Sequence, residues 1–419
     1  QFMVKTNRFT LDNGLHVVHL EDKTSQTVTL NTVFDVGSKD EDPEHTGFAH
    51  LFEHLMFSGS VNVDDYDGVL QKAGAYNNAF TTQDLTNYYV VLPAVNAEVG
   101  FWVESDRMLS LAFNEKGLEV QREVVSEEFK ERTSNKPYGD AYHHLFAMMY
   151  PADHTYSWPT IGKEIKHIQD ATMQDVKDFF FSHYAPNNAY LSVVGNISLD
   201  EVKRLVDKYY GDIPSRGVTK RKMAEIPEQT AEQRKIVSGD VPNDKLYMVF
   251  HSPSRLDDDY YASDILSDLL SNGMSSRMYK RLIVEKKMFS SIDACIRGSL
   301  EDGAFYVIGV PNEGFTRDEV ENAIWDELEL LKTESVEKLE LEKVVNKYEA
   351  TQILSDLSEA AKAERLGYYE MIGAPDLINT DFDNYSKVTP DELRKAAQKI
   401  FRRENCCALW YMKNDSSRA

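Results

Sequence analysis

Two histidines and a glutamate stand close together in the segment His50-Leu-Phe-Glu-His54, and their types and spacing suit metal chemistry. Side chains four residues apart lie on one face of a helix, so His50 and His54 can present two imidazoles to a single ion. Glu53 can reach a water at that ion without ligating the metal. Zinc lowers the pKa of such a water, and the carboxylate can take its proton and pass it to a leaving amine. The segment therefore predicts metal-assisted hydrolysis.

The third ligand of such a site must come from elsewhere, because catalytic zinc has three protein ligands and one open position. The carboxylate-rich run 121–131 offers four candidates, and spacing does not choose among Glu123, Glu127, Glu128 and Glu131. The alternative interpretation is a buried helix with hydrogen-bonded histidines. The apolar residues around the motif disfavour it, because each imidazole would then need its own polar partner in the core.

The elements that must position these residues indicate an α+β chain. Asn13-Gly14 is a tight-turn signal between two extended runs, which predicts a hairpin over residues 9–20. Alternating β-branched residues predict a strand over 27–36. Further strands are expected at 86–92 and 188–194, and helices at 45–57, 118–132, 137–149, 173–184 and 199–210.

The second half of the chain repeats the order of the first, with a strand at 246–252 and a helix at 261–270. Setting Leu269 against Leu55 aligns the two helices. The residues opposite His50, Glu53 and His54 are then Asp264, Ser267 and Asp268. We therefore expect two copies of one α/β unit, of which only the first keeps metal-type residues.

The length of 419 residues is enough for two domains. The segment from Ile213 to Lys235 is rich in Pro, Lys, Arg, Glu and Gln and is typical of a linker. The expected division is a zinc-bearing catalytic domain at 1–215, a linker at 216–235 and a homologous domain without metal residues at 236–419.

The composition excludes two classes of partner. The formal net charge is 46 − 69 = −23, which disfavours nucleic acid, whose binding depends on Lys and Arg meeting phosphate. The sequence has no run of about 20 apolar residues, so no membrane span is predicted. The acidity favours basic peptides as substrates, or serves only to keep a large protein soluble.

Five motifs together resemble the pitrilysin family of inverzincin metallopeptidases, which includes insulin-degrading enzyme and the mitochondrial processing peptidase. The resemblance covers nearly the whole chain and is greatest to the shorter bacterial members, which form half of a clamshell. The motifs are Gly47–Ser60, Tyr76–Tyr89, Arg122–Glu128, His154–Gly162 and Tyr184–Gly195. The resemblance implies two homologous α+β domains that face each other across a chamber. In each of them, helices would cover one side of a mostly antiparallel sheet.

The resemblance also implies roles for individual residues. His50 and His54 match the zinc histidines, Glu53 the general base, and Glu128 the distal ligand, so one Zn²⁺ per chain is expected. The run Asn78-Ala79-Phe80 matches the edge strand that pairs with the substrate backbone. Strand addition of this kind suits unfolded peptides, because main-chain hydrogen bonds do not depend on side chains.

Two departures from the family pattern bear on activity. Gln121 stands seven residues before Glu128, where the family often has a glutamate, and this removes one negative charge. Family members that act alone have an Arg and a Tyr seven residues apart that hold the substrate carbonyl, and the matching positions here are Val284 and Ser291. Unless the register differs and Arg281 substitutes, we expect a homologous second subunit, as a heterodimer or homodimer, to supply that pair.

The predicted function is a zinc endopeptidase that hydrolyses unfolded peptides or small proteins. One alternative is a non-catalytic scaffold or peptide-binding subunit of the same family, which the intact motif disfavours. The other is a zinc hydrolase of small molecules, which the peptide-pairing segment disfavours. The chain begins at Gln1 rather than Met, which suits a removed leader, and the bacterial resemblance favours the periplasm over the cytoplasm.

Overall fold

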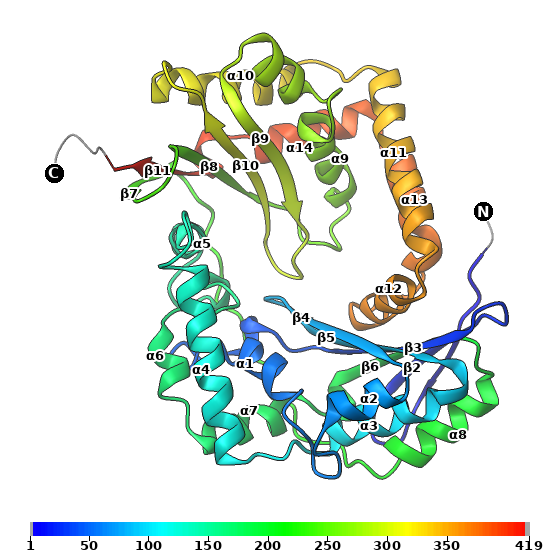
Figure 1. Ribbon diagram of the computed structural model, residues 1–419. Coiled ribbons are helices and arrows are strands. Elements are labelled where there is room, and N and C mark those ends of the chain that lie inside the picture. The colour runs from blue at the N-terminus through cyan, green and yellow to red at the C-terminus, as the bar shows by residue number, and fades with distance from the viewer. Residues whose placement is uncertain (1–2, 415–419) are drawn as a thin grey trace. The chain divides into compact units, whose positions relative to one another are not determined.

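The computed structural model describes residues 3–414, which fold into two compact units with one sheet each (Figure 1). Of the described residues, unit 1 comprises 3–130, Trp158–Met223 and Ile353–Thr380. Unit 2 comprises Glu131–Ser157, Ala224–Gln352 and 381–414. The units are therefore interleaved, unlike the contiguous division at 1–215, 216–235 and 236–419 expected from the sequence.

Two helices account for most of this difference. Helix α12 (Glu359–Met371), late in the sequence, packs against the sheet of unit 1, where Glu359 accepts hydrogen bonds from Ser25, Thr27 and Thr29. Helix α5 (Ala141–Met149) packs instead against the sheet of unit 2. Local patterns show that a segment is helical but not which sheet covers its apolar face, so the linear division could not reveal the exchange.

The sheet of unit 1 has the strand order β1-β2-β6-β3-β5-β4, in which only β2 and β6 run parallel. The hairpin predicted around Asn13-Gly14 is confirmed by the antiparallel pairing of β1 and β2. Strand β4 is an edge strand. The bounds are β1 Asn7–Thr10, β2 His16–Glu21, β3 Thr27–Phe34, β4 Tyr76–Thr81, β5 Thr86–Pro93 and β6 Ala189–Gly195.

Helices cover both faces of this sheet, so the expectation of a single covered side was wrong (Figure 1). Side chains alternate along a strand, so Val193 joins the large core beneath most of the helices, whereas Val194 packs with Leu366 of α12 on the opposite face. The remaining helices are α1 Phe48–Leu55, α2 Tyr66–Lys72, α3 Ala97–Leu109, α4 Glu115–Arg132, α6 Ile165–Gln169, α7 Met173–His183 and α8 Leu199–Tyr210.

Unit 2 repeats the topology of unit 1. Its order is β7-β11-β8-β10-β9, with only β7 and β11 parallel, and this matches β2-β6-β3-β5-β4 strand for strand. The internal repeat predicted from the sequence is therefore confirmed at the level of topology. The bounds are β7 Gln233–Gly239, β8 Lys245–Ser252, β9 Phe289–Arg297, β10 Gly303–Pro311 and β11 Cys406–Lys413.

The helices of unit 2 complete the α+β architecture. Phe250 of β8 packs with Trp325 of α10 in the main core, and Tyr142 of α5 contacts Tyr247 and Tyr306 on the other face. The helices are α9 Tyr260–Ser271, α10 Arg317–Thr333, α11 Lys338–Asp356, α13 Leu377–Ser386 and α14 Pro390–Ile400. Among residues 3–414, no helix is both long and apolar enough to cross a lipid bilayer.

Candidate metal centre

Helix α1 carries both histidines, and its start is determined by Gly47. This residue is the N-cap and has a φ of 83°, a left-handed conformation that favours glycine. A Cβ at this position would lie only 2.9 Å from Cδ1 of Ile168. The helix predicted over 45–57 is therefore shorter, because it cannot begin before Phe48.

A buried carboxylate anchors the first turn of α1. Glu41 is fully buried and accepts hydrogen bonds from the backbone N–H groups of Gly47 and Ala49, at 3.0 and 2.9 Å, and from the Trp158 indole at 2.9 Å. These bonds satisfy helix N-terminal donors that would otherwise be orphaned in the core. Burial raises the pKa of Glu41 to about 8, against the lowering effect of these three hydrogen bonds.

The structure brings His50, His54 and Glu128 together within unit 1. Their ligand atoms all lie within 4.8 Å of one another, and no other group of this kind occurs among residues 3–414. The Oε2 atom of Glu128 is 3.4 Å from Nε2 of His50 and 3.1 Å from Nε2 of His54. The imidazole centroids are 5.0 Å apart, with the rings nearly perpendicular at 86°.

This arrangement fits zinc. A tetrahedral ion with ligand bonds of about 2.0–2.1 Å holds neighbouring ligand atoms about 3.3 Å apart. The two measured N···O separations, 3.1 and 3.4 Å, lie on either side of that value. Two imidazole nitrogens and one carboxylate oxygen are also a donor set of catalytic zinc, which keeps its fourth position open.

Helix α4 places one of its four candidate carboxylates at the histidines. Glu128 comes within hydrogen-bonding distance of His54. Glu123, Glu127 and Glu131 are exposed, and Glu127 pairs with Lys130 at 2.7 Å. Gln121 lies two turns before Glu128, about 10 Å along the helix axis, so its amide cannot ligate the same ion.

Glu53 lies beside the two grouped histidines on α1, but its carboxylate is not part of the group. Its Oε2 accepts a hydrogen bond of 2.5 Å from the hydroxyl of Thr81, the last residue of β4. Among the described residues, this is the one hydrogen-bond partner of the Glu53 carboxylate. The carboxylate is therefore held next to the imidazoles with its second oxygen available for a water.

Strand β4 contains the predicted substrate-pairing residues Asn78, Ala79 and Phe80. It pairs with β5 on one side only, so its other edge is open within the sheet. The N–H of Ala79 donates to the side-chain oxygen of Asn78 at 2.8 Å. The open edge therefore has at least one main-chain donor that an added strand could take over.

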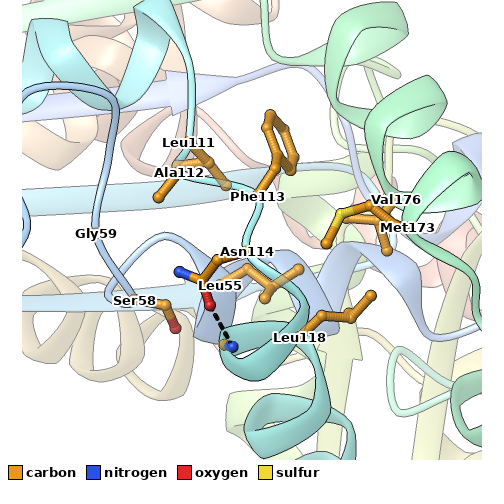
Figure 2. A pocket seen from close by; sticks show the side chains of 11 residues that line it. Leu55, Ser58, Gly59, Leu111, Ala112, Phe113, Asn114, Leu118, Met173 and Val176 are labelled. Carbon is orange, nitrogen blue, oxygen red and sulfur yellow. Dashed lines mark hydrogen bonds between the residues drawn. The ribbon is translucent and has the colours of Figure 1, made fainter.

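A small cavity lies at the end of α1, between the two helices that carry the grouped side chains. Figure 2 shows it lined by Leu55 of α1, Leu118 of α4, and Met173 and Val176 of α7. Asn114 caps the start of α4 there, because its Oδ1 accepts the N–H of Gly117 at 2.5 Å. The volume of about 20 Å³ is enough for one water but not for a peptide, so substrate must reach the imidazoles elsewhere.

In unit 2, α9 is the counterpart of α1 and carries no histidine. Asp264 accepts a hydrogen bond of 2.5 Å from Tyr385, and burial together with Asp264 raises the pKa of Asp268 to about 6. Two of the three positions aligned with His50, Glu53 and His54 are thus half-buried aspartates in this unit.

Val284 and Ser291 are both exposed in unit 2. Val284 lies in the short helix Tyr279–Glu285, and Ser291 lies on β9. Arg281, the alternative donor, pairs through Nη1 with the buried Glu327 at 2.7 Å. Its guanidinium is therefore already engaged.

Two residues around the grouped side chains were missed by the sequence analysis, Thr81 and Glu41. Thr81 is three residues after the second of two adjacent asparagines on β4, but its hydrogen bond to Glu53 depends on how β4 packs against α1. Glu41 sits in the polar run 39–44, which reads as a surface loop. No sequence spacing links either residue to the histidines.

Two family models match the chain. Insulinase (Peptidase family M16) matches residues 16–155, and Peptidase M16 inactive domain matches residues 170–348. The chain is 29% identical over 351 residues to zinc protease PqqE of Helicobacter pylori. The aligned residues cover 82% of this chain and 78% of that protein.

Solved structures share the whole fold. The crystal structure of a protease from Helicobacter pylori has a TM-score of 0.91 at 25% identity, covering 98% of this chain and 100% of that one. The periplasmic protease PqqL from Escherichia coli has a TM-score of 0.79 at 19% identity, covering 99% of this chain but 48% of that one. With both halves matched in sequence and the fold matched from end to end, the chain belongs to peptidase family M16, the pitrilysin family.

Proposed function

We propose that this chain is the zinc-bearing subunit of an endopeptidase that hydrolyses unfolded peptides or small proteins. The observation that carries the proposal is the convergence of His50, His54 and Glu128, with Glu53 beside them. The name of the relative PqqE, a zinc protease, supports zinc as the ion.

Different side chains of this protein have different roles in the proposed hydrolysis. His50, His54 and Glu128 would hold the ion, one per chain, and Glu53 would transfer the proton. When bound, zinc supplies Lewis acidity, which acidifies water and polarises the peptide carbonyl. Glu53 takes a proton from the attacking water, on the carboxylate oxygen not bonded to Thr81, and delivers it to the leaving amine nitrogen.

The open edge of β4 is the proposed substrate platform. An extended peptide that pairs with this edge replaces the Asn78 oxygen at the Ala79 N–H and continues the sheet. Because β4 ends at Thr81, beside Glu53, this pairing brings the peptide to the base. Most main-chain groups of a folded protein are already paired within it, so unfolded chains are the proposed substrates.

A homologous second subunit completes the proposed enzyme. Val284 and Ser291 replace an Arg/Tyr pair that would stabilise charge on the carbonyl oxygen, and such donors contribute about 10²–10³-fold to kcat. The chain of PqqL is about twice as long as this one, as a protein with two halves of this size would be. We therefore assign the missing donors to a partner chain.

A non-catalytic, peptide-binding subunit is the second candidate. One observation favours it, since the model that matches residues 170–348 is described as an inactive domain. The same chain, however, retains the complete set of His50, Glu53, His54 and Glu128.

Glu53→Gln separates the two candidates. The zinc content and the hydrolysis of a quenched-fluorescent unfolded peptide are measured on the chain purified with its partner. We expect Glu53→Gln to keep one zinc and to lower kcat about 10²–10⁴-fold, because the base is lost while the ligands remain. His50→Ala should lose both zinc and activity. A wild-type protein without stoichiometric zinc, or a Glu53→Gln enzyme as fast as wild type, would contradict the proposal.

A further inference from the structure

We infer that Thr81 is a positioning residue, which holds the Glu53 carboxylate in place and couples it to the strand on which the substrate lies. The inference rests on the proposed function and deepens it. It starts from one contact, the 2.5 Å hydrogen bond from the Thr81 hydroxyl to Oε2 of Glu53, between an edge strand and the helix of the metal ligands.

The chemistry of this bond is directional. A hydroxyl that donates to a carboxylate makes a short, charge-assisted hydrogen bond, which is about twice as strong as a neutral one. A glutamate has three side-chain torsions, and its terminal torsion is broad, so the base samples many orientations unless a neighbour fixes it. With Oε2 bonded to Thr81, Oε1 of Glu53 is the oxygen left to accept the proton of a water.

The neighbouring threonine, Thr82, makes different hydrogen bonds, so only the Thr81 hydroxyl contacts the base. The hydroxyl oxygen of Thr82 accepts the N–H groups of Asp84 and Leu85, at 3.1 Å each, and so builds the turn between β4 and β5. For the Thr81 side chain, by contrast, the described structure gives no hydrogen bond besides that to Glu53. Its removal should therefore change the base without opening the hairpin.

Thr81 also links substrate and base through the strand. It follows Asn78, Ala79 and Phe80 in β4 and pairs with Thr86 of β5. A peptide added to the open edge turns β4 from an edge strand into an inner strand, paired on both sides. The hydroxyl of Thr81 is then held more firmly, so the base is best fixed when substrate is present, and preorganisation of this kind acts on kcat.

The test uses two substitutions of Thr81 and a matched control. Thr81→Val keeps a β-branched side chain on the strand but removes the donor, whereas Thr81→Ser keeps the donor. The control is Thr27→Val, which removes another threonine–glutamate hydrogen bond of the same sheet, from Thr27 to Glu359 at 2.9 Å, in a part-buried place. Zinc content, melting temperature, kcat and KM on an unfolded peptide are measured for each protein with its partner.

We expect Thr81→Val to keep stoichiometric zinc, to leave KM within about twofold and to lower kcat about 10- to 100-fold, the range for a hydrogen bond to a charged group. Thr81→Ser should recover kcat to within about threefold of wild type, and Thr27→Val should leave kcat unchanged. A fluorescent unfolded peptide should bind chelator-treated wild-type and Thr81→Val protein equally, because the edge of β4 is the same in both.

Each contrary result has its own meaning. If wild type is active and Thr81→Val has the same kcat, or Thr81→Ser is as slow as Thr81→Val, the positioning role is wrong while the proposed function stands. Loss of zinc or of folding in Thr81→Val would assign Thr81 a structural role and overturn the inference. A wild-type complex that holds zinc but hydrolyses no peptide would overturn the proposed function, and the role of Thr81 with it.

Discussion

The charges of the candidate metal centre balance at the residue level. Imidazoles that ligate a metal are neutral, so the carboxylates of Glu128 and Glu53 would supply the two negative charges that offset a divalent ion. A third carboxylate would leave an excess negative charge in a half-buried place, where screening by water is weak. Gln121 is neutral and about two helical turns from Glu128, so its effect on the ion can only be long-range.

The neighbouring carboxylates Glu127 and Glu128 allow a matched test of the third ligand. Glu128→Gln should weaken zinc binding by more than the 10- to 100-fold that loss of a group behind a ligand costs, because a ligand itself is neutralised. Glu127→Gln should leave the Kd for zinc nearly unchanged, because exposed ion pairs such as that with Lys130 contribute less than about 1 kcal/mol.

The Kd for zinc is measured by competition with a chromophoric chelator. If Glu127→Gln weakens binding and Glu128→Gln does not, the ligand assignment is off by one residue. Equal effects of both substitutions would show that charge near the ion matters more than ligation by one carboxylate.

At the scale of elements, the order of strands and helices follows from sequence patterns, but their ends and partners do not. The hairpin at Asn13-Gly14 and the helix Leu199–Tyr210 agree with expectation, because turn chemistry and apolar periodicity are local. Helix α5 begins at Ala141 and not at 137, since Tyr138 has a φ of 62° and breaks the helix. The place of α12 on the sheet of unit 1 depends on contacts between distant segments, which no local pattern records.

The same limit applies to the candidate metal centre. His50, Glu53 and His54 share one helix, so their proximity could be predicted from spacing. The sequence offers four candidate carboxylates on α4, and it is the packing of α4 against α1 that brings Glu128 to the imidazoles. Physical reasoning from the residues left that choice open, and only the family resemblance indicated Glu128. The roles of these residues as ligands and base stay predictions until zinc is measured.

Helix α7 ends in a histidine that should make stability depend on pH. Burial lowers the pKa of His183 to about 4, helped by the nearby positive charges of Lys220, Lys39 and Arg221 and opposed by Asp35. In the unfolded chain the imidazole titrates near 6.5. Between these values the unfolded state binds more protons than the folded state, so stability is full above about pH 6.5 and falls as the pH drops toward 4.

The measurement compares urea unfolding of wild type and His183→Gln at pH 7.5 and 5.0. Wild type should lose about 2 kcal/mol more than the variant over this interval, from the two pKa values and the linkage relation. All other histidines are the same in both proteins, so their contribution cancels in the difference. Equal losses in the two proteins would show that folding does not lower the pKa of His183.

At the scale of the whole molecule, the two units share a topology but not a chemistry. In unit 1, α1 carries the histidines, while in unit 2 the aligned helix α9 carries the half-buried Asp264 and Asp268, and Asp264 accepts a hydrogen bond from Tyr385 of α13. Edge strand β9 is the counterpart of β4, yet Ser271 occupies both main-chain groups of Ala294 on it, at 2.8 and 3.0 Å. Unit 2 therefore offers a less open edge to peptides than unit 1.

The remaining question at this scale is whether one chain is a complete enzyme, and the exposed positions Val284 and Ser291 make it testable. We expect the isolated, zinc-loaded chain to have a kcat/KM on unfolded peptides at least about 100-fold below that of the chain with its partner, because it lacks the donors for the carbonyl oxygen. The double substitution Val284→Arg/Ser291→Tyr should raise the activity of the isolated chain. Arg281→Met should leave the activity per folded molecule unchanged, because the guanidinium of Arg281 is already paired with Glu327. Robust turnover by the isolated wild-type chain, abolished by Arg281→Met, would instead show that the register is shifted and that Arg281 is the donor.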